Sequence, residues 1–155
     1  MSYLIDTNVL LRRADLSHAQ HQVAHEAVEW LLARGEELYI TPQNLIEFRA
    51  VATRPIENRG LAWTPQQASA EVVRLETTFL LAPDTSDIYP EWRRLVHVHQ
   101  VIGLPVHDAR LAAVMAVYGI SHLLTFNASH FRRYPHITVG EPQDVQPPAA
   151  EAPEV

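Results

Sequence analysis

The sequence predicts an α/β fold, a three-layer α/β/α sandwich around a mostly parallel sheet of about four to five strands. Short apolar runs alternate along the 155-residue chain with longer segments of helical periodicity. This order calls for a parallel sheet with helices on both faces. Two of the runs, at 2–5 and 121–125, also change from apolar to polar at their ends, as strands do at the ligand-binding edge of such sheets. We predict one domain over residues 1–140 and a tail at 141–155.

The first strand, residues 2–5, ends at Asp6 and is followed by one or two helical turns up to Asp15. Ser17 is the expected N-cap of a helix that runs to about Arg34 and is closed by a glycine. One face of that helix carries the apolar residues Ala24, Ala27, Val28, Leu31 and Leu32.

The second strand is expected at 38–40 and is followed at once by a helix. Residues 41–42 are Thr-Pro, which combines a preferred N-cap with a proline at the first helical position. A polar loop then leads to a second Thr-Pro pair, which begins a helix over 64–79. Residues 80–82 are the expected third strand.

Residues 87–139 are expected to contain two helices, two strands and one helical turn. A helix over 87–101 is broken by Gly103 and Pro105, and an alanine-rich helix follows over 108–118. The remaining elements are the fourth strand at 121–125, a helical turn at 127–131 and a last strand at 137–139. The tail is acidic and rich in Pro and Ala, and we expect it to be disordered.

Composition narrows the class of protein. The chain has 47% hydrophobic residues, no cysteine, and no apolar stretch as long as a membrane span. We therefore expect no disulfide, no thiolate metal site and no secretory signal, and we expect a cytoplasmic location. The formal net charge is −6, but four carboxylates and no basic residue lie after Gly140. The body thus carries only −2, which does not exclude nucleic acid as a partner.

Three acidic residues stand at positions where a carboxylate is costly. Asp6 follows a buried strand, Glu47 lies beside the apolar side of a helix, and Asp108 precedes an alanine-rich segment. Carboxylates in apolar surroundings lose hydration energy, and only ion pairing or metal binding offsets this cost. A group of them is best explained by a hard cation such as Mg²⁺ or Mn²⁺. The alternative is that they are separate helix caps and ion pairs with Arg49 or Arg110.

Four motifs occur in order along the chain: LIDTNVLL, TPQNLIEF, VHDARLAA and LLTFNASHFRRYP. Together they resemble the PIN domain, the nuclease fold of VapC-type toxins, over essentially residues 2–140. The resemblance implies a parallel sheet between helices and an endoribonuclease that depends on Mg²⁺ or Mn²⁺. It also implies a toxin of a type II toxin–antitoxin pair, with RNA as substrate, a small antitoxin as partner and a homodimer as assembly.

The resemblance also implies roles for individual residues. Asp6 and Asp108 would be catalytic residues that ligate the metal directly, and Glu47 would ligate it directly or through water. The other polar residues that match the family are Thr7, Asn8 and Thr125.

The last motif has no carboxylate at either of two positions, Asn127 and His130. Family members have an acidic residue or Asn at the first position, and many have Asp at the second. Asn127 can coordinate a metal or orient a water through its carbonyl oxygen, so we include it among the catalytic-site residues. It adds no charge, however, so a second metal would be held more weakly. His130 would contact phosphate or fill a turn.

Other functions stay open at this point. A catalytically weak PIN-like module that binds RNA or a partner protein is the main alternative, because the fourth carboxylate is missing. A phosphatase with Asp6 as nucleophile is disfavoured, because Asn8 replaces the second Asp that such enzymes use. The residues Arg12, Arg13, Arg49 and Arg110 would steer the RNA backbone or form a solvated face.

One further cluster has helical spacing. His18, His21 and His25, with Glu29, would share one helix face and could bind Zn²⁺ or Ni²⁺. We favour a polar, exposed face without a metal.

Overall fold

The computed structural model describes residues 1–146. In this part of the chain, five parallel strands form one sheet in the order β3-β2-β1-β4-β5. The strands are β1 (Ser2–Ile5), β2 (Glu37–Ile40), β3 (Leu80–Leu81), β4 (His122–Leu124) and β5 (Thr138–Gly140). The parallel sheet and the α/β class predicted from the sequence are confirmed.

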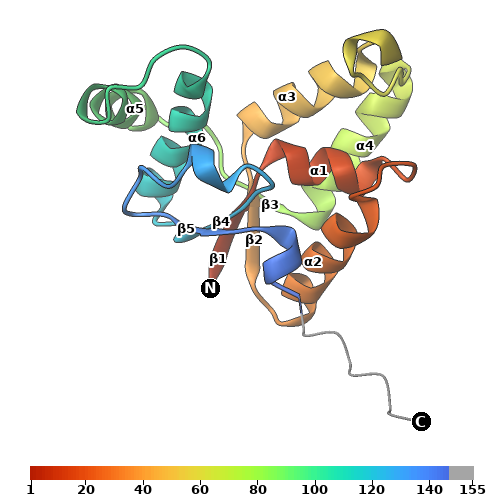
Figure 1. Cartoon of the computed structure of the whole chain (residues 1–155), viewed down its shortest axis with the longest axis horizontal. Helices are drawn as coiled ribbons and strands as arrows, with labels where there is room; N and C mark the ends of the chain where they lie inside the picture. Colours follow the sequence, from red (N-terminus) through yellow and green to blue (C-terminus); the bar gives the residue numbers. More distant parts are fainter. Residues whose placement is uncertain (147–155) are drawn as a thin grey trace.

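Helices cover both faces of the sheet and make the three-layer sandwich (Figure 1). The helices are α1 (Thr7–Ala14), α2 (His21–Ala33), α3 (Pro42–Thr53), α4 (Pro65–Thr78), α5 (Ile88–Val98) and α6 (Pro105–Tyr118). Helices α1 to α4 pack on one face, and α5 and α6 pack on the other. None of the helices within residues 1–146 is long and apolar enough to cross a membrane.

Strand β1 lies at the centre of the sheet and is buried on both faces. Tyr3 and Ile5 pack into the layer of α1 to α4, whereas Leu4 packs into the layer of α5 and α6. This alternation follows from the period of two in a strand. The chain moves outward from β1 to β2 and β3, and then returns to place β4 on the other side of β1. Such a reversal is a topological switch point, where open α/β sheets bind ligands.

Two helix starts differ from the sequence prediction. Helix α2 begins at His21 and not after Ser17, because the Asp15 carboxylate accepts hydrogen bonds from the Ser17 amide and hydroxyl and forms a turn. Helix α6 begins at Pro105, three residues before Asp108. We had interpreted Pro105 as a helix breaker, but proline fits the first helical position, where its missing N–H costs nothing.

The described chain continues past the predicted end of the domain. We expected residues 141–155 to be a disordered tail, but Pro142–Asp144 form a short 3-10 helix, η3. Val145 packs against the core, and the Gln146 side chain donates a hydrogen bond to the Val23 carbonyl at 2.8 Å. Residues 141–146 are therefore part of the packed domain. The rest of the expected tail, 147–155, lies outside the described residues.

Helices α3 and α4 begin with the same sequence, Thr-Pro-Gln, and each has a capping box. In α3, Thr41 and Asn44 bond to each other and are both fully buried. In α4, the Thr64 and Gln67 box is exposed to solvent. The two helix starts thus offer the same chemistry at two levels of burial.

We expect Thr64→Ala to lower the free energy of unfolding by about 1 kcal/mol, the usual cost of a lost N-cap. Thr41→Ala should cost about 2 kcal/mol or more, because it also leaves buried polar atoms without partners. Urea denaturation of both variants measures this difference. An equal cost for the two variants would contradict the importance of burial at Thr41.

Candidate active site

Asp6 stands at the point where β1 turns into α1. Its amide donates to the Leu124 carbonyl at 2.9 Å, which continues the pairing of β1 with β4. Its carboxylate accepts from the Thr7 amide and from the Thr125 hydroxyl, both at 2.7 Å. Asp6 therefore does cap α1, as the alternative interpretation proposed. Only 6% of the residue is exposed, which a cap alone does not require.

Burial changes the ionisation of Asp6. The pKa of its carboxyl is raised to about 6: loss of hydration is the largest cause, the hydrogen bonds from Thr125 and Thr7 oppose it, and the charges of Asp108 and Glu47 add to it. No Arg, Lys or His side chain forms an ion pair with Asp6 in the described chain. The carboxylate is thus a buried negative charge that hydrogen bonds satisfy only in part.

Glu47 reaches the same edge of the sheet from α3. Its Oε2 accepts from the Thr7 hydroxyl at 2.8 Å, and its Oε1 accepts from the Gln43 amide at 2.8 Å. The buried Asn44 donates to the Thr7 oxygen at 3.1 Å, so the Thr7 hydroxyl is left to donate to Glu47. Both carboxylate oxygens of Glu47 are therefore held by donors.

Asp108 approaches from the opposite helical layer, on α6. Its Oδ2 lies 3.1 Å from Nδ1 of His130, which belongs to the short 3-10 helix η2 (Ala128–His130). Burial raises the pKa of the Asp108 carboxyl, His130 opposes this shift, and Glu47 adds to it. His130, for which the sequence suggested only a phosphate contact or a turn, is thus the partner of a site carboxylate.

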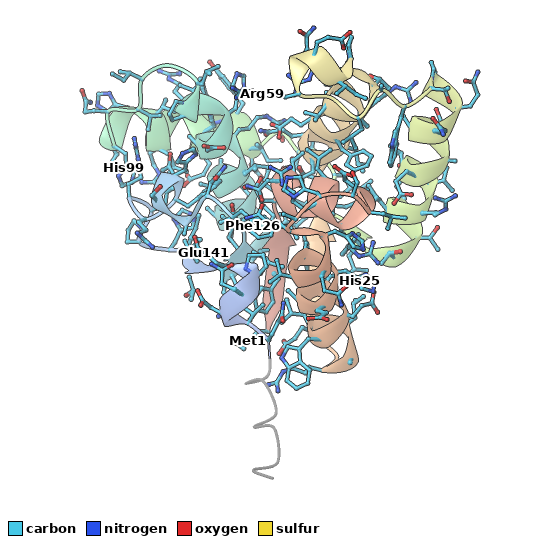
Figure 2. All side chains as sticks on the ribbon, turned by 45° about the vertical axis from the view of Figure 1, so that its right-hand side comes forward. Met1, His25, Arg59, His99, Phe126 and Glu141 are labelled. Carbon is cyan, nitrogen blue, oxygen red and sulfur yellow. The ribbon has the colours of Figure 1, made fainter. Side chains whose placement is uncertain are left out.

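Thr125 organises the end of β4. Its hydroxyl donates to Asp6 and accepts from the Asn127 amide at 3.0 Å and from the Asn8 side chain at 3.3 Å. The Asn8 oxygen in turn accepts from the amide of Phe126 at 3.2 Å. Phe126 is labelled near the centre of the molecule in Figure 2, beside α1. Asn127 itself is exposed, and its side chain makes no hydrogen bond within residues 1–146.

The structure thus brings Asp6, Glu47 and Asp108 to one edge of the sheet, at the switch point between β1 and β4. The charges of Asp108 and Glu47 raise the pKa of Asp6, and the charge of Glu47 raises the pKa of Asp108, so the three carboxylates lie close together. As the side chains stand in the described chain, no three acidic or histidine residues surround a single metal position. The donor set nonetheless fits a hard divalent cation, because it consists of carboxylate oxygens with excess negative charge in a partly dry site.

The ion pairs offered as alternatives are absent from the described residues. Arg49 donates to Ser69, and Arg110 pairs with Asp84 at 2.9 Å. Neither arginine pairs with Glu47 or Asp108. The acidic set is therefore not a collection of surface salt bridges.

The remaining arginines and the histidine cluster have partners of their own. Arg12 donates to Gln20, and Arg13 pairs with Glu29. His18 lies in the turn before α2, and the half-buried rings of His21 and His25 stack at 5.9 Å. No group of metal ligands forms there in residues 1–146.

Sequence reasoning missed Gln43 and Asn44, which hold Glu47 and Thr7. The signal for Gln43 was available, because it lies four residues before Glu47 on one helix face. The signal for Asn44 was its position in the capping box after Thr41.

A family model described as PIN domain matches residues 3–137. The chain belongs to the PIN domain family. A search of curated protein sequences found no significant match.

Solved structures with the same fold include complexes of toxin–antitoxin systems. VapBC2 from Rickettsia felis, bound to a DNA fragment from its promoter, has a TM-score of 0.68 and 16% identity, over 91% of this chain and 98% of that one. VapBC-1 from nontypeable Haemophilus influenzae has a TM-score of 0.69 and 13% identity, over 92% of this chain and 99% of that one. VapC20 from Mycobacterium tuberculosis is described as a toxin that cleaves the sarcin–ricin loop. It has a TM-score of 0.60 and 21% identity, over 83% of this chain and 92% of that one. At these identities the likeness shows a PIN fold of the VapC type.

We expect the raised pKa of Asp6 to make the metal-free protein less stable as pH rises from about 4 to about 6. In this window the unfolded chain loses the Asp6 proton whereas the folded chain keeps it, so rising pH favours unfolding. A shift from 3.8 to about 6 corresponds to roughly 3 kcal/mol at most.

Denaturation in EDTA, compared between wild type and Asp6→Asn, isolates this contribution. The difference in unfolding free energy should shift in favour of Asp6→Asn as pH rises through the window and then level off. A difference that does not change with pH would mean that the Asp6 carboxyl ionises normally in the folded protein.

Proposed function

We propose that this protein is a metal-dependent endoribonuclease and the toxin of a type II toxin–antitoxin pair. The observation that carries the proposal is the buried Asp6 carboxylate beside Glu47 and Asp108, without a cationic side chain paired to Asp6 in the described chain. A divalent cation would remove the cost of gathering these charges. The VapC-type fold supports the same conclusion.

Asp6 and Asp108 are the proposed direct ligands of Mg²⁺ or Mn²⁺, and Glu47 would bind directly or through water. The chemistry supplied by such a cation is neutralisation of charge on the scissile phosphate and a lowered pKa of a bound water. The site's own hydroxyls do not suit a nucleophile's role: Thr7 is 6% exposed and Thr125 0%, and they donate to Glu47 and Asp6. Water is therefore the proposed nucleophile.

Hydrogen bonds within the protein prepare the acidic set. Thr125 and the Thr7 amide fix the two oxygens of Asp6, so this carboxylate does not reorient when a ligand arrives. Asn127, next to Thr125, offers an uncharged oxygen at the exposed side of the site. The site thus holds three formal carboxylates and one amide, which favours one tightly held cation over two.

RNA is the proposed substrate, and a small antitoxin is the proposed partner. VapC20 is described as cleaving the sarcin–ricin loop, and other structures of this fold are toxin–antitoxin complexes. We also propose a homodimer and a cytoplasmic location. The toxin–antitoxin pairing would be supported by a neighbouring reading frame that encodes a small DNA-binding protein, if that protein co-purifies with this chain.

We expect RNA cleavage with Mg²⁺ or Mn²⁺ and none in EDTA. Asp6→Asn and Asp108→Asn should each lower the cleavage rate by more than about 100-fold, because each removes a ligand charge. Asp87→Asn is the matched control, since Asp87 is an exposed residue at the start of α5, and it should cleave like wild type. Cleavage that survives EDTA or the Asp6→Asn and Asp108→Asn double change would sink the proposal.

A second function is favoured by one observation, the neutral Asn127 in place of a fourth carboxylate. In that case the protein is a catalytically weak PIN-like module that binds RNA. Calorimetry distinguishes the two functions: weak binding of Mn²⁺ together with intact RNA binding supports the module, whereas turnover of many RNA molecules per protein excludes it.

A further inference from the structure

Gln43 joins the two helical layers of the sandwich at the acidic edge of the sheet. It lies in the first turn of α3, and its Nε2 donates to Glu47 Oε1 and to the His107 carbonyl, each at 2.8 Å. Its Oε1 accepts from Arg110 Nη1 at 3.3 Å. His107 and Arg110 flank Asp108 in the first turns of α6. One side chain thus bonds to Glu47 on α3 and to the first turn of α6, which carries Asp108.

The partners leave only one orientation for the Gln43 amide. The Glu47 carboxylate and the His107 carbonyl are acceptors, so they must face the NH₂ group, whereas the Arg110 guanidinium only donates, so it must face the oxygen. Arg110 is anchored in turn by Asp84, which follows β3, at 2.9 Å. The chain Asp84–Arg110–Gln43–Glu47 is therefore satisfied at each link in a single arrangement.

This chain restrains a side chain that would otherwise be mobile. Glu47 is half-buried, and a glutamate loses up to about 2 kcal/mol of conformational entropy when it is fixed. In the described residues its carboxylate receives two hydrogen bonds, one from Thr7 and one from Gln43. Thr7 follows Asp6 directly, so its bond ties Glu47 to Asp6. Of the hydrogen bonds to Glu47 within residues 1–146, only the one from Gln43 leads on to α6 and thereby to Asp108.

We propose that Gln43 is a positioning residue that sets Glu47 against Asp108 for cation binding, and that Arg110 acts through Gln43. This inference rests on the proposed function, because it assigns Gln43 to the same cation site. It also gives Arg110 a role other than steering RNA, because its guanidinium donates to Gln43 and to Asp84 within the protein.

Binding of Mn²⁺ alone to the full chain tests the proposal without relying on activity. Gln43→Leu keeps most of the side-chain volume and removes all three hydrogen bonds, so it should weaken Mn²⁺ binding by about 10-fold or more, as is usual for residues that orient metal ligands. Gln66→Leu is the matched control. Gln66 has the same place after Thr-Pro at the start of α4 but is exposed, and this change should leave Mn²⁺ binding as in wild type.

Arg110→Met provides an independent route if Gln43→Leu folds poorly, because it leaves Gln43 in place without its anchor. It should weaken Mn²⁺ binding less than Gln43→Leu does. In the Gln43→Leu background, Arg110→Met should cause no further loss, because Arg110 acts only through Gln43. Additive losses from the two changes would overturn the proposed chain.

Two other outcomes would overturn the inference in distinguishable ways. If wild type binds Mn²⁺ and Gln43→Leu binds it equally well while melting at a lower temperature, Gln43 is a structural tie between layers, and only its positioning role fails. If wild type does not bind Mn²⁺ at all, the proposed function itself fails, and the role of Gln43 fails with it.

Discussion

The buried charge of Asp6 is the constraint on which the rest of the site depends. The parallel register of β1 and β4 puts Asp6 beside Thr125, and the switch in strand order leaves space there for a ligand rather than for another crossover helix. The surrounding hydrogen bonds orient the carboxylate and lower its pKa, but loss of hydration on burial outweighs them, so the pKa is raised. The cation that we propose for this site would complete the arrangement.

The two helical layers contribute unequally to the site. The layer of α1 to α4 supplies Glu47 together with its holding residues, whereas the layer of α5 and α6 supplies Asp108 and, through η2, its partner His130. Gln43 bonds across the two layers at this edge. Repulsion among the site carboxylates therefore destabilises the metal-free protein, and a bound cation would offset this loss of stability.

Local sequence patterns predicted the alternation of strands and helices, because apolar runs and Thr-Pro starts are short-range signals. They could not predict the strand order, since β1 also pairs with β4, whose residues lie more than a hundred positions away along the chain. Asp6, Glu47 and Asp108 were predicted as site residues from their apolar contexts and from resemblance, and the structure places them at one edge of the sheet. The residues that hold the site were harder to predict from the sequence, because they bond across distant elements: His130 bonds to Asp108, and Gln43 bonds to the His107 carbonyl. The prediction of Ser17 as a helix N-cap was wrong, because the Ser17 amide and hydroxyl donate to the Asp15 carboxylate.

The ionisation of Asp6 itself tests the central claim most directly. Carbon-13 NMR of the aspartate side-chain carboxyl groups, followed against pH, reports the pKa of Asp6 with and without saturating Mg²⁺. The account predicts a pKa near 6 in EDTA and a value well below 4 with Mg²⁺, because a bound cation stabilises the charged form. A pKa for Asp6 that is the same in EDTA and in Mg²⁺ would contradict it.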